Sequence, residues 1–406
     1  MNIWYLSAHD QPRGQSARTY EFSSELVKLG HTVTMFTNGF CHWTHKEYLE
    51  PQESWRIEDF DGIRVVWLKT TPYYGNGFSR GANMISNARR CLQVSKVLED
   101  RPDVVIGPSV PLGTGWAALR IAKRKGAAFI FEIRDVWPMA LVDDGGLSKL
   151  NPVFFVFRFL EKMLYQNADR ISATMPFVFN HVAQSGADPD KVSWIPNGVN
   201  LDRFRGYNEY DGGKQDQLTV MYVGGFGAAH DVITIVKAAK ILKQNGISKI
   251  RFIIIGSGPK KVECLNYAAE NRLDTVEFRD PIPKAEIPKA QQESDVLIAA
   301  VLDSPIYRFG LNLNKMFDYF ASARPVIFSG KAPNDPVIDA GAGLSILPEN
   351  PQAMADSILE FLKMSPDQRK AMGMRGYKYI EDYKMEQLGL RMETLLLDAV
   401  HKRECE

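Results

Sequence analysis

The sequence has little cysteine, no marked excess of charge of either sign and no long hydrophobic run. Four cysteines are scattered over 406 residues without paired spacing, which excludes a disulfide scaffold and a zinc site and favours a reducing compartment. The 49 basic and 48 acidic side chains nearly cancel, so nucleic acid is not indicated as a main partner. The longest apolar stretch, 151–165, contains charges and is too short to span a bilayer. Since the N-terminus also lacks the pattern of a signal peptide, we expect a cytoplasmic protein.

Short β-type runs alternate with helical stretches on both sides of a polar segment at 197–217. Examples are NIWYLSA and DVVIGPS before this segment, and LTVMYVGG and DVLIAAV after it. Such alternation predicts two doubly wound, Rossmann-like α/β domains, whose ligands bind at the carboxyl ends of the strands. The expected boundaries are 1–199 for the first domain, 200–380 for the second domain and 381–406 for a helix returning to the first domain.

The segment YRFGLNLNKMFDYFASARPVI, 307–327, concentrates polar residues at the start of a predicted helix. Lys315 and Asp318 are three residues apart, which places them on one helix face. The opposite face can enter a core through Leu313, Met316, Phe317 and Phe320. Asn312 or Asn314 is expected to cap the helix and leave backbone N–H groups for an anion. A cation, a carboxylate and a helix N-terminus together can hold a phosphate and a sugar hydroxyl.

Two further loops place glycines between a strand and a helix, in YVGGFGAAHD at 222–231 and in IIIGSGPKK at 253–261. Glycine lets the backbone approach a ligand, and the following helix start offers N–H donors. Each loop alone is equally well explained as a tight turn. Neither matches a P-loop, and the first lacks the full dinucleotide fingerprint.

The N-terminal half has its own polar strand ends. HDQPRGQSAR, 9–18, is a glycine-containing loop with two arginines, and FEIRDVWP, 131–138, ends an apolar strand with Glu132, Arg134 and Asp135. Such charges mark either a site edge or a local Arg134–Asp135 ion pair. His9 and His230 are candidate general bases, with a structural role as the alternative for each. The acidic pairs at 143–144 and 188–190 have no further ligands nearby in sequence, so no metal site is predicted.

These motifs, in this order, resemble family 4 of the GT-B glycosyltransferases along nearly the whole chain. The similarity rests on the PRG loop, LVKLGHTVTMFT, FEIRDVWP, ADRISATM, VSWIPNGVNLDRF, YVGGFG, IIIGSGP and NKMFDYFASARPVI. EIRDVWP with SPIYRFG is similar to the branch that assembles O-antigen and capsule and includes N-acetylfucosamine transferases. The resemblance implies a GT-B fold, with two Rossmann-like domains facing a central cleft, the first (1–199) on the acceptor side and the second (200–380) binding the nucleotide sugar.

The resemblance also implies roles for residues. Lys315 is expected to bind the donor diphosphate and Asp318 the ribose, while Asp280–Ile282 hold the nucleobase. The whole expected donor site comprises Gly224, Gly225, Phe226, Gly227, His230, Gly256, Gly258, Asp280, Pro281, Ile282, Gly310, Asn314 and Asp318. The expected catalytic residues are Asp135, Arg134, Arg308 and Lys315, with Asp135 orienting or deprotonating the acceptor, and the acceptor is expected to contact Arg13, Gly14 and Arg18.

Two positions depart from the family pattern. An acid that often contacts the donor sugar, eight residues before the second acid, is replaced by Gly310, which leaves the donor sugar open. The arginine and lysine that many members carry after the first glycine loop are missing from GGFGAAHDVITIVK. Arg308 is therefore expected to share the phosphate charge with Lys315, with help from His230.

The predicted function is a retaining, metal-independent glycosyltransferase without a cofactor. It would move a sugar from a nucleotide sugar, expected to be a UDP-N-acetylated sugar, to a polyprenyl-diphosphate-linked or glycan acceptor in surface-polysaccharide synthesis. The alternatives are a nucleotide-sugar epimerase on the same scaffold and a non-catalytic nucleotide-sugar-binding protein, since a fold does not fix a function.

Two segments of the N-terminal half suggest contact with anionic lipid at the cytoplasmic face of the inner membrane. Segment 75–96 combines basic residues with apolar ones, and PVFFVFRFLEKMLY carries four phenylalanines in six positions. Core packing is the favoured interpretation of the second segment taken alone. A basic and apolar rim resting on the inner leaflet is the alternative.

Overall fold

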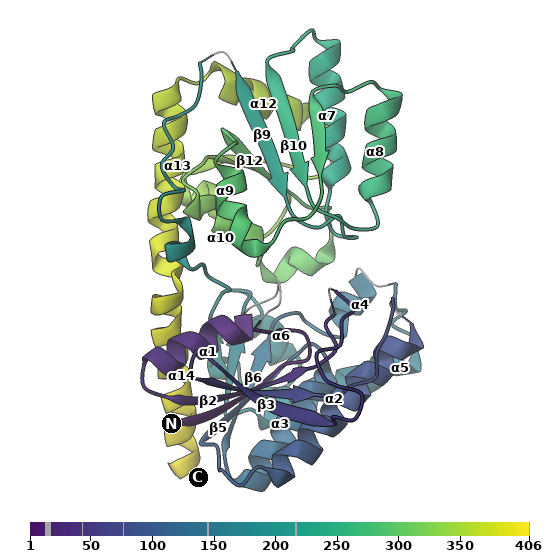
Figure 1. The fold of residues 1–406 in the computed structure, drawn as a ribbon, viewed down its shortest axis with the longest axis vertical. Coiled ribbons are helices and arrows are strands. Elements are labelled where there is room, and N and C mark those ends of the chain that lie inside the picture. Colours follow the sequence, from purple (N-terminus) through teal and green to yellow (C-terminus); the bar gives the residue numbers. More distant parts are fainter. Residues whose placement is uncertain (13–17, 43, 76, 144–145, 216, 406) are drawn as a thin grey trace. The chain divides into compact units, whose positions relative to one another are not determined.

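The computed structural model divides the chain into two compact units and describes residues 1–12, 18–42, 44–75, 77–143, 146–215 and 217–405 (Figure 1). Unit 1 consists of Met1–Asn197 with Met385–Glu406, and unit 2 of Gly198–Lys384. Both units are built on mostly parallel sheets flanked by helices. The predicted fold class, two doubly wound α/β domains, is confirmed.

Unit 1 has an eight-stranded sheet, in the order β3-β4-β2-β1-β5-β6-β7-β8, with β3 alone antiparallel to its neighbour among the described strands. Its strands are β1 Asn2–Leu6, β2 Thr32–Asn38, β3 Trp55–Phe60, β4 Ile63–Leu68, β5 Val104–Pro108, β6 Ala128–Ile133, β7 Arg170–Ala173 and β8 Val192–Trp194. Its helices are α1 Arg18–Lys28, α2 Phe78–Val97, α3 Leu112–Lys125, α4 Met139–Asp143, α5 Pro152–Asn167, α6 Phe179–Gln184 and α14 Met385–Cys405.

Unit 2 has a six-stranded parallel sheet in the order β11-β10-β9-β12-β13-β14. Its strands are β9 Leu218–Val223, β10 Ile250–Ile255, β11 Val276–Arg279, β12 Val296–Ala300, β13 Val326–Ser329 and β14 Gly343–Ile346. Its helices are α7 Val232–Gln244, α8 Lys261–Glu270, α9 Ile287–Gln291, α10 Asn314–Ala321, α11 Pro336–Ala340, α12 Pro351–Lys363 and α13 Pro366–Ile380, and a 3-10 turn, η4, covers Pro305–Phe309.

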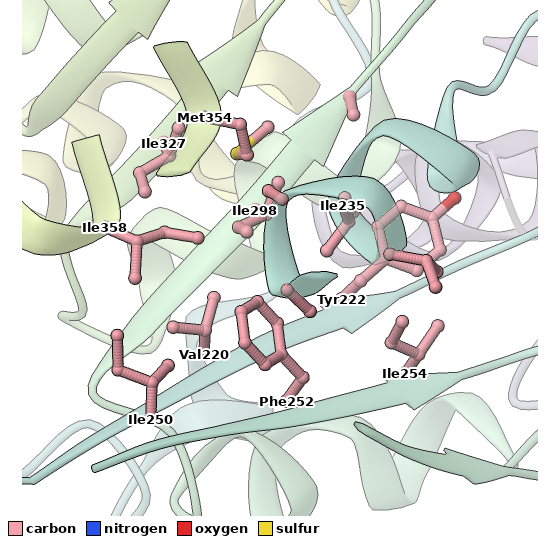
Figure 2. Packing of buried hydrophobic residues seen from close by; sticks show 14 of the residues in the cluster. Val220, Tyr222, Ile235, Ile250, Phe252, Ile254, Ile298, Ile327, Met354 and Ile358 are labelled. Atoms are coloured by element: carbon pink, nitrogen blue, oxygen red, sulfur yellow. The ribbon is translucent and has the colours of Figure 1, made fainter. Parts of the chain in front are cut away.

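The core of unit 2 follows from the apolar runs of its central strands. Val220 of β9, Phe252 of β10 and Ile298 of β12 are buried on one sheet face, where they pack with Ile358 of α12 (Figure 2). Because these strands are covered on both faces, they are apolar at nearly every position instead of alternating. The sheet is thereby rigid enough to hold the loops at its carboxyl edge in place.

The core of unit 1 is completed from the far end of the chain. Helix α14 lies beside α1 (Figure 1). Its residues Met385, Leu388, Met392 and Leu396 are buried in the same cluster as Ile3 of β1. The sheet of unit 1 is therefore covered partly by residues that follow unit 2 in the sequence.

Helix α5 departs from the core packing favoured for its segment. Leu164 and Tyr165 near its end are buried, whereas Phe155 is 59% and Phe159 71% exposed. Four phenylalanines in six positions cannot share one helix face, so some of them have to point outward. None of the described helices is both long and apolar enough to cross a membrane.

Candidate functional site

In unit 2 the strand order reverses between β9 and β12, so their carboxyl ends lie at the switch point where doubly wound sheets bind ligands. Strand β9 leads into loop 224–231, and β12 leads through η4 into α10. The loops after β10 and β11 follow at the same edge. The sheet thus brings together the glycine loops and the helix that the sequence singled out.

Lys315, the second residue of α10, reaches back to strand β9. Its Nζ donates to the hydroxyl of Tyr222 at 2.8 Å and lies 4.2 Å from the centre of the Tyr222 ring. Burial lowers the pKa of Lys315 to about 7. An anion bound beside the ammonium would favour its charged form and raise the pKa again. Lys315 is therefore positioned as the cation of an anion site.

Tyr222 connects Lys315 to the first glycine loop. Its hydroxyl donates to the carbonyl oxygen of Gly225 at 2.6 Å. At Gly224, a Cβ would come within 2.7 Å of the Lys315 Nζ, so a side chain there would displace the ammonium. Sequence reasoning missed Tyr222, because in TVMYVGG it resembles any other buried strand residue. The only signal was a hydroxyl one residue before the end of the strand.

The second glycine loop packs directly on the first. A Cβ on Gly256 would overlap the carbonyl oxygen of Gly224, and one on Gly258 would lie 2.7 Å from the carbonyl oxygen of Phe226. The N–H of Phe226 donates to the carbonyl of Ser257 at 2.8 Å. These glycines therefore allow two loops to approach each other, and the contact fixes the backbone next to Lys315.

His230 closes the first loop. Its Nδ1 accepts from the N–H of Gly227 at 3.2 Å. Burial, assisted by the charges of Lys315 and Lys260, lowers the pKa of His230 to about 3. Burial therefore favours the neutral imidazole, which accepts a hydrogen bond from the loop backbone.

Helix α10 begins without the expected side-chain cap. Its N-cap is Leu313, neither Asn312 nor Asn314 caps it, and Asn314 is exposed as its first residue. The prediction of an asparagine cap was wrong, because the extended backbone at Leu313 starts the helix one residue after Asn312. The apolar face is buried as expected, with Met316 and Phe320 in the core.

Asp318 and Arg308 flank the start of the helix. Asp318 is half-buried on α10, three residues after Lys315. Arg308 is exposed in η4, where its Nη1 donates to the carbonyl of Pro305 and its guanidinium lies 4.5 Å from the Phe309 ring centre. Gly310 is the residue directly after η4 and is buried. Arg308 thus lies on the segment between β12 and α10, but its described contacts are local.

The loop after β11 is open to solvent. Asp280 is exposed and forms an ion pair with Lys261 of α8, at 3.2 Å between Oδ1 and Nζ. Pro281 is also exposed, whereas Ile282 packs against the core. Asp280 and Pro281 therefore leave their backbone at the edge of the sheet.

In unit 1, Arg134 directly after β6 and Arg18 at the start of α1 belong to a buried ion network. Arg134 binds Asp10 at 2.7 Å and Glu132 at 2.6 Å, and Arg18 binds the other oxygen of Glu132 at 2.9 Å. Burial opposes ionisation of Glu132, but the charges of Arg134 and Arg18 outweigh it and hold the pKa of Glu132 below its usual value. Besides Asp10 and Glu132, Arg134 donates from Nη2 to the hydroxyl of Thr19 at 2.6 Å. Asp10 was missed, because nothing in HDQPRGQSAR distinguishes it from a turn residue.

Asp135 is exposed at the carboxyl end of β6. The hydroxyl of Ser109, at the end of β5, donates to the carbonyl oxygen of Asp135 at 2.8 Å and accepts from the N–H of Arg134 at 3.1 Å. Ser109 thus fixes the backbone that presents the Asp135 side chain. The predicted acceptor residues Arg13 and Gly14 lie outside the described residues.

No group of potential metal ligands occurs within the described part of the chain. Asp188 instead caps a 3-10 turn by accepting from the N–H of Asp190 at 2.9 Å. Asp143 ends α4, and Asp144 lies outside the described residues.

The arrangement in unit 2 can bind a phosphate through Lys315, the glycine-loop backbone and the start of α10.

Both halves of the chain match known protein families. Residues 13–198 match a model described as a glycosyl transferase 4-like domain, and residues 217–364 match one described as glycosyl transferases group 1. No curated protein matches the chain significantly.

Solved structures show the same fold at low sequence identity. Sucrose-phosphate synthase from Thermosynechococcus elongatus is 17% identical, covering 97% of this chain and 98% of its own, with a TM-score of 0.73. Anabaena HepE, crystallised with UDP and glucose, is 11% identical over 98% and 99% of the two chains, with a TM-score of 0.69. WaaG, a glycosyltransferase involved in lipopolysaccharide biosynthesis, is 14% identical over 98% and 99%, with a TM-score of 0.68.

Proposed function

We propose that this chain, which belongs to the glycosyltransferases of the GT-B type, transfers a hexosyl group from a UDP-sugar to an acceptor hydroxyl, with retention of configuration. The proposal rests on the position of Lys315, whose Nζ donates to the Tyr222 hydroxyl and lies beside Gly224 at the switch point of unit 2. UDP is preferred as the nucleotide because a structural neighbour, HepE, was crystallised with it.

The chemical role of the site follows from where charge develops. As the glycosidic bond breaks, negative charge builds up on the leaving diphosphate, and a fixed cation and backbone N–H groups stabilise it. We assign this to Lys315 and the start of α10, with Arg308 as the second cation and Asp318 accepting from the ribose. No divalent ion is then needed for the same task. Asp135 orients or deprotonates the acceptor.

An assay on a panel of UDP-, GDP- and ADP-sugars tests this function. We expect transfer from a UDP-N-acetylated sugar to a lipid-linked saccharide acceptor, unchanged by EDTA. An isomerised donor without transfer would indicate an epimerase, and nucleotide binding without either product would indicate a non-catalytic protein. Loss of transfer with EDTA that Mg²⁺ or Mn²⁺ restores would contradict the metal-independent mechanism.

The affinity for UDP should depend on pH because of Lys315. With a pKa of about 7 in the free protein, the lysine is charged below pH 7 and largely neutral above it. Binding the diphosphate above pH 7 then requires uptake of a proton, so the affinity should fall by up to about tenfold per pH unit. Isothermal titration between pH 7.5 and 9 in buffers of different ionisation enthalpy measures both the slope and the proton uptake.

The matched control is Lys315→Arg, because arginine keeps its charge throughout this range. Its UDP affinity should vary little between pH 7.5 and 9. An equally flat profile for the wild type would show that Lys315 is not the group that pairs with the diphosphate.

We further propose that unit 1 rests on anionic lipid at the cytoplasmic face of the inner membrane, where a polyprenyl-diphosphate-linked acceptor in O-antigen or capsule synthesis would lie. The exposed face of α5 presents Val153, Phe155, Val156 and Phe159. On α2, Ile85 is 71% exposed, and Arg89 and Lys96 are exposed as well. Apolar side chains can bury themselves shallowly, and each basic residue near the surface adds about 1 kcal/mol.

Sedimentation with anionic liposomes at low salt should recover the protein in the pellet, and added salt should release it. Phe155→Ser/Phe159→Ser and Arg80→Ser/Arg89→Ser/Arg90→Ser should each weaken recovery severalfold, since each removes one of the two attractions. The control is Leu397→Ser, at an exposed position of α14, which should leave recovery in the pellet unchanged. Recovery in the supernatant with and without lipid would indicate a soluble acceptor.

A further inference from the structure

Aromatic and imidazole rings gather at the carboxyl edge of unit 1, beside Asp10 and Arg134 of the ion network. We call His9, Phe40, His42 and Tyr73 the ring cluster. The ring centres of His9 and His42 are 5.1 Å apart, those of His42 and Tyr73 are 5.8 Å apart, and those of Phe40 and Tyr73 are 5.5 Å apart. These residues follow β1, β2 and β4, which are neighbours in the sheet. The cluster therefore lies where a doubly wound sheet binds ligands.

His9 is exceptional within the cluster. Both of its ring nitrogens are shielded from solvent, and neither has a hydrogen-bond partner among the residues that the structure describes. A neutral imidazole carries one donor and one acceptor, and buried polar atoms are almost always paired in native proteins. Two nitrogens on one ring without a described partner are therefore available to pair with a bound molecule.

The neighbouring histidine is held in a defined orientation. The Tyr73 hydroxyl and the His42 Nδ1 are 2.5 Å apart, and Tyr73 itself is buried. Burial lowers the pKa of His9 to about 3 and that of His42 to about 4, with further contributions from Arg80. Both rings are therefore neutral at physiological pH, which suits the recognition of uncharged hydroxyl groups instead of an anion.

From the available nitrogens of His9 and the rings beside it, we propose that the ring cluster binds the acceptor sugar, with His9 positioning its hydroxyl groups. His9 donates to one sugar oxygen and accepts from another hydroxyl. Tyr74, 73% exposed, and His45 lie with ring centres 5.3 Å apart and extend the rings toward solvent. Their faces can pack on the apolar C–H surface of a sugar ring. This inference rests on the proposed transferase function and names a residue that specifies its acceptor.

The test uses the full chain with saturating UDP and a panel of p-nitrophenyl glycosides of glucose, galactose, N-acetylglucosamine and N-acetylgalactosamine. Saturation-transfer NMR should detect binding of at least one glycoside. His9→Phe keeps a ring but removes both nitrogens, and should weaken that binding roughly ten- to a hundredfold. His9→Gln, which restores a donor and an acceptor, should recover part of it. His401→Phe, at an exposed position of α14, is the matched control.

The outcomes separate this inference from the proposed function. UDP affinity, measured on the same samples, should be equal in the wild type and in His9→Phe. Absence of UDP binding by the wild type would overturn the proposed function. With UDP binding intact, failure of every glycoside to bind, or equal glycoside affinity in wild type and His9→Phe, would overturn the role of His9. If His9→Phe is unfolded by its melting curve, His42→Phe takes its place, with the same weakening expected.

Discussion

Lys315→Ala is expected to reduce turnover by about a hundredfold to a thousandfold and UDP affinity by one to two decades. The affinity loss corresponds to a charge-assisted contact of about 1.5–3 kcal/mol. The loss of turnover follows because the leaving diphosphate carries more negative charge in the transition state than in the bound sugar nucleotide, so the missing cation costs more there. Steady-state kinetics on a UDP-sugar and titration with UDP measure the two effects separately.

Two companion variants define what Lys315 does. Asp318→Asn should weaken the nucleotide with little further effect on turnover, because its proposed partner is the ribose. Arg308→Ala should lower both turnover and affinity if it replaces the cations missing after the first glycine loop. Wild-type activity of Lys315→Ala would remove the central assignment, and unchanged behaviour of Arg308→Ala would leave the missing charge unexplained.

The second large effect is expected on stability, from Arg134→Ala. This change leaves Asp10 and Glu132, which are 1% and 0% exposed, without one of their cations. Breaking a buried ion pair by removing one partner costs about 3–5 kcal/mol, because the remaining charge is buried and uncompensated. A fall in Tm of roughly 10 °C should follow for a unit of this size. Differential scanning calorimetry measures it.

The control for Arg134 is Arg205→Ala, which breaks an ion pair with Asp202 between side chains that are 84% and 68% exposed. Exposed pairs contribute about 0–1 kcal/mol, so its Tm should stay close to that of the wild type. A stable Arg134→Ala protein without activity would assign Arg134 to the chemistry instead of the fold. UDP binding should persist wherever unit 2 remains folded.

The fold could be predicted because it depends on patterns that are local in sequence. Apolar runs, helical stretches and turn residues define each βαβ unit, and the handedness of such units leaves few arrangements. The loops that follow parallel strands all lie at the carboxyl edge of the sheet, so the glycine loops and α10 were expected to lie together at that edge. The core face of α10 is a further example, since the spacing of Met316 and Phe320 alone determined it.

The details of the sites depend on partners that are distant in sequence. Tyr222 and Lys315 are 93 residues apart, and Arg134 and Asp10 are 124 apart, so neither contact leaves a local pattern. The start of α10 illustrates a different limit. Whether an asparagine caps a helix depends on one residue of register, which propensity does not determine. For α5 the sequence left core packing and an outward apolar face as alternatives, because an apolar helix segment has the same composition in a core and on a surface.

The path of the chain through unit 1 has a consequence for how the protein is synthesised. Residues 198–384 form unit 2 and are inserted into unit 1, whose helix α14 comes from beyond that insertion. A ribosome therefore releases the eight-stranded sheet of unit 1 long before the helix that covers it. Domains generally fold as they emerge from the ribosome. The core of unit 1, however, cannot be completed before α14 has been synthesised. Ile3 and its neighbours therefore stay uncovered by α14 while unit 2 is translated and folds. Unit 2, although second in the sequence, is the first that can be finished.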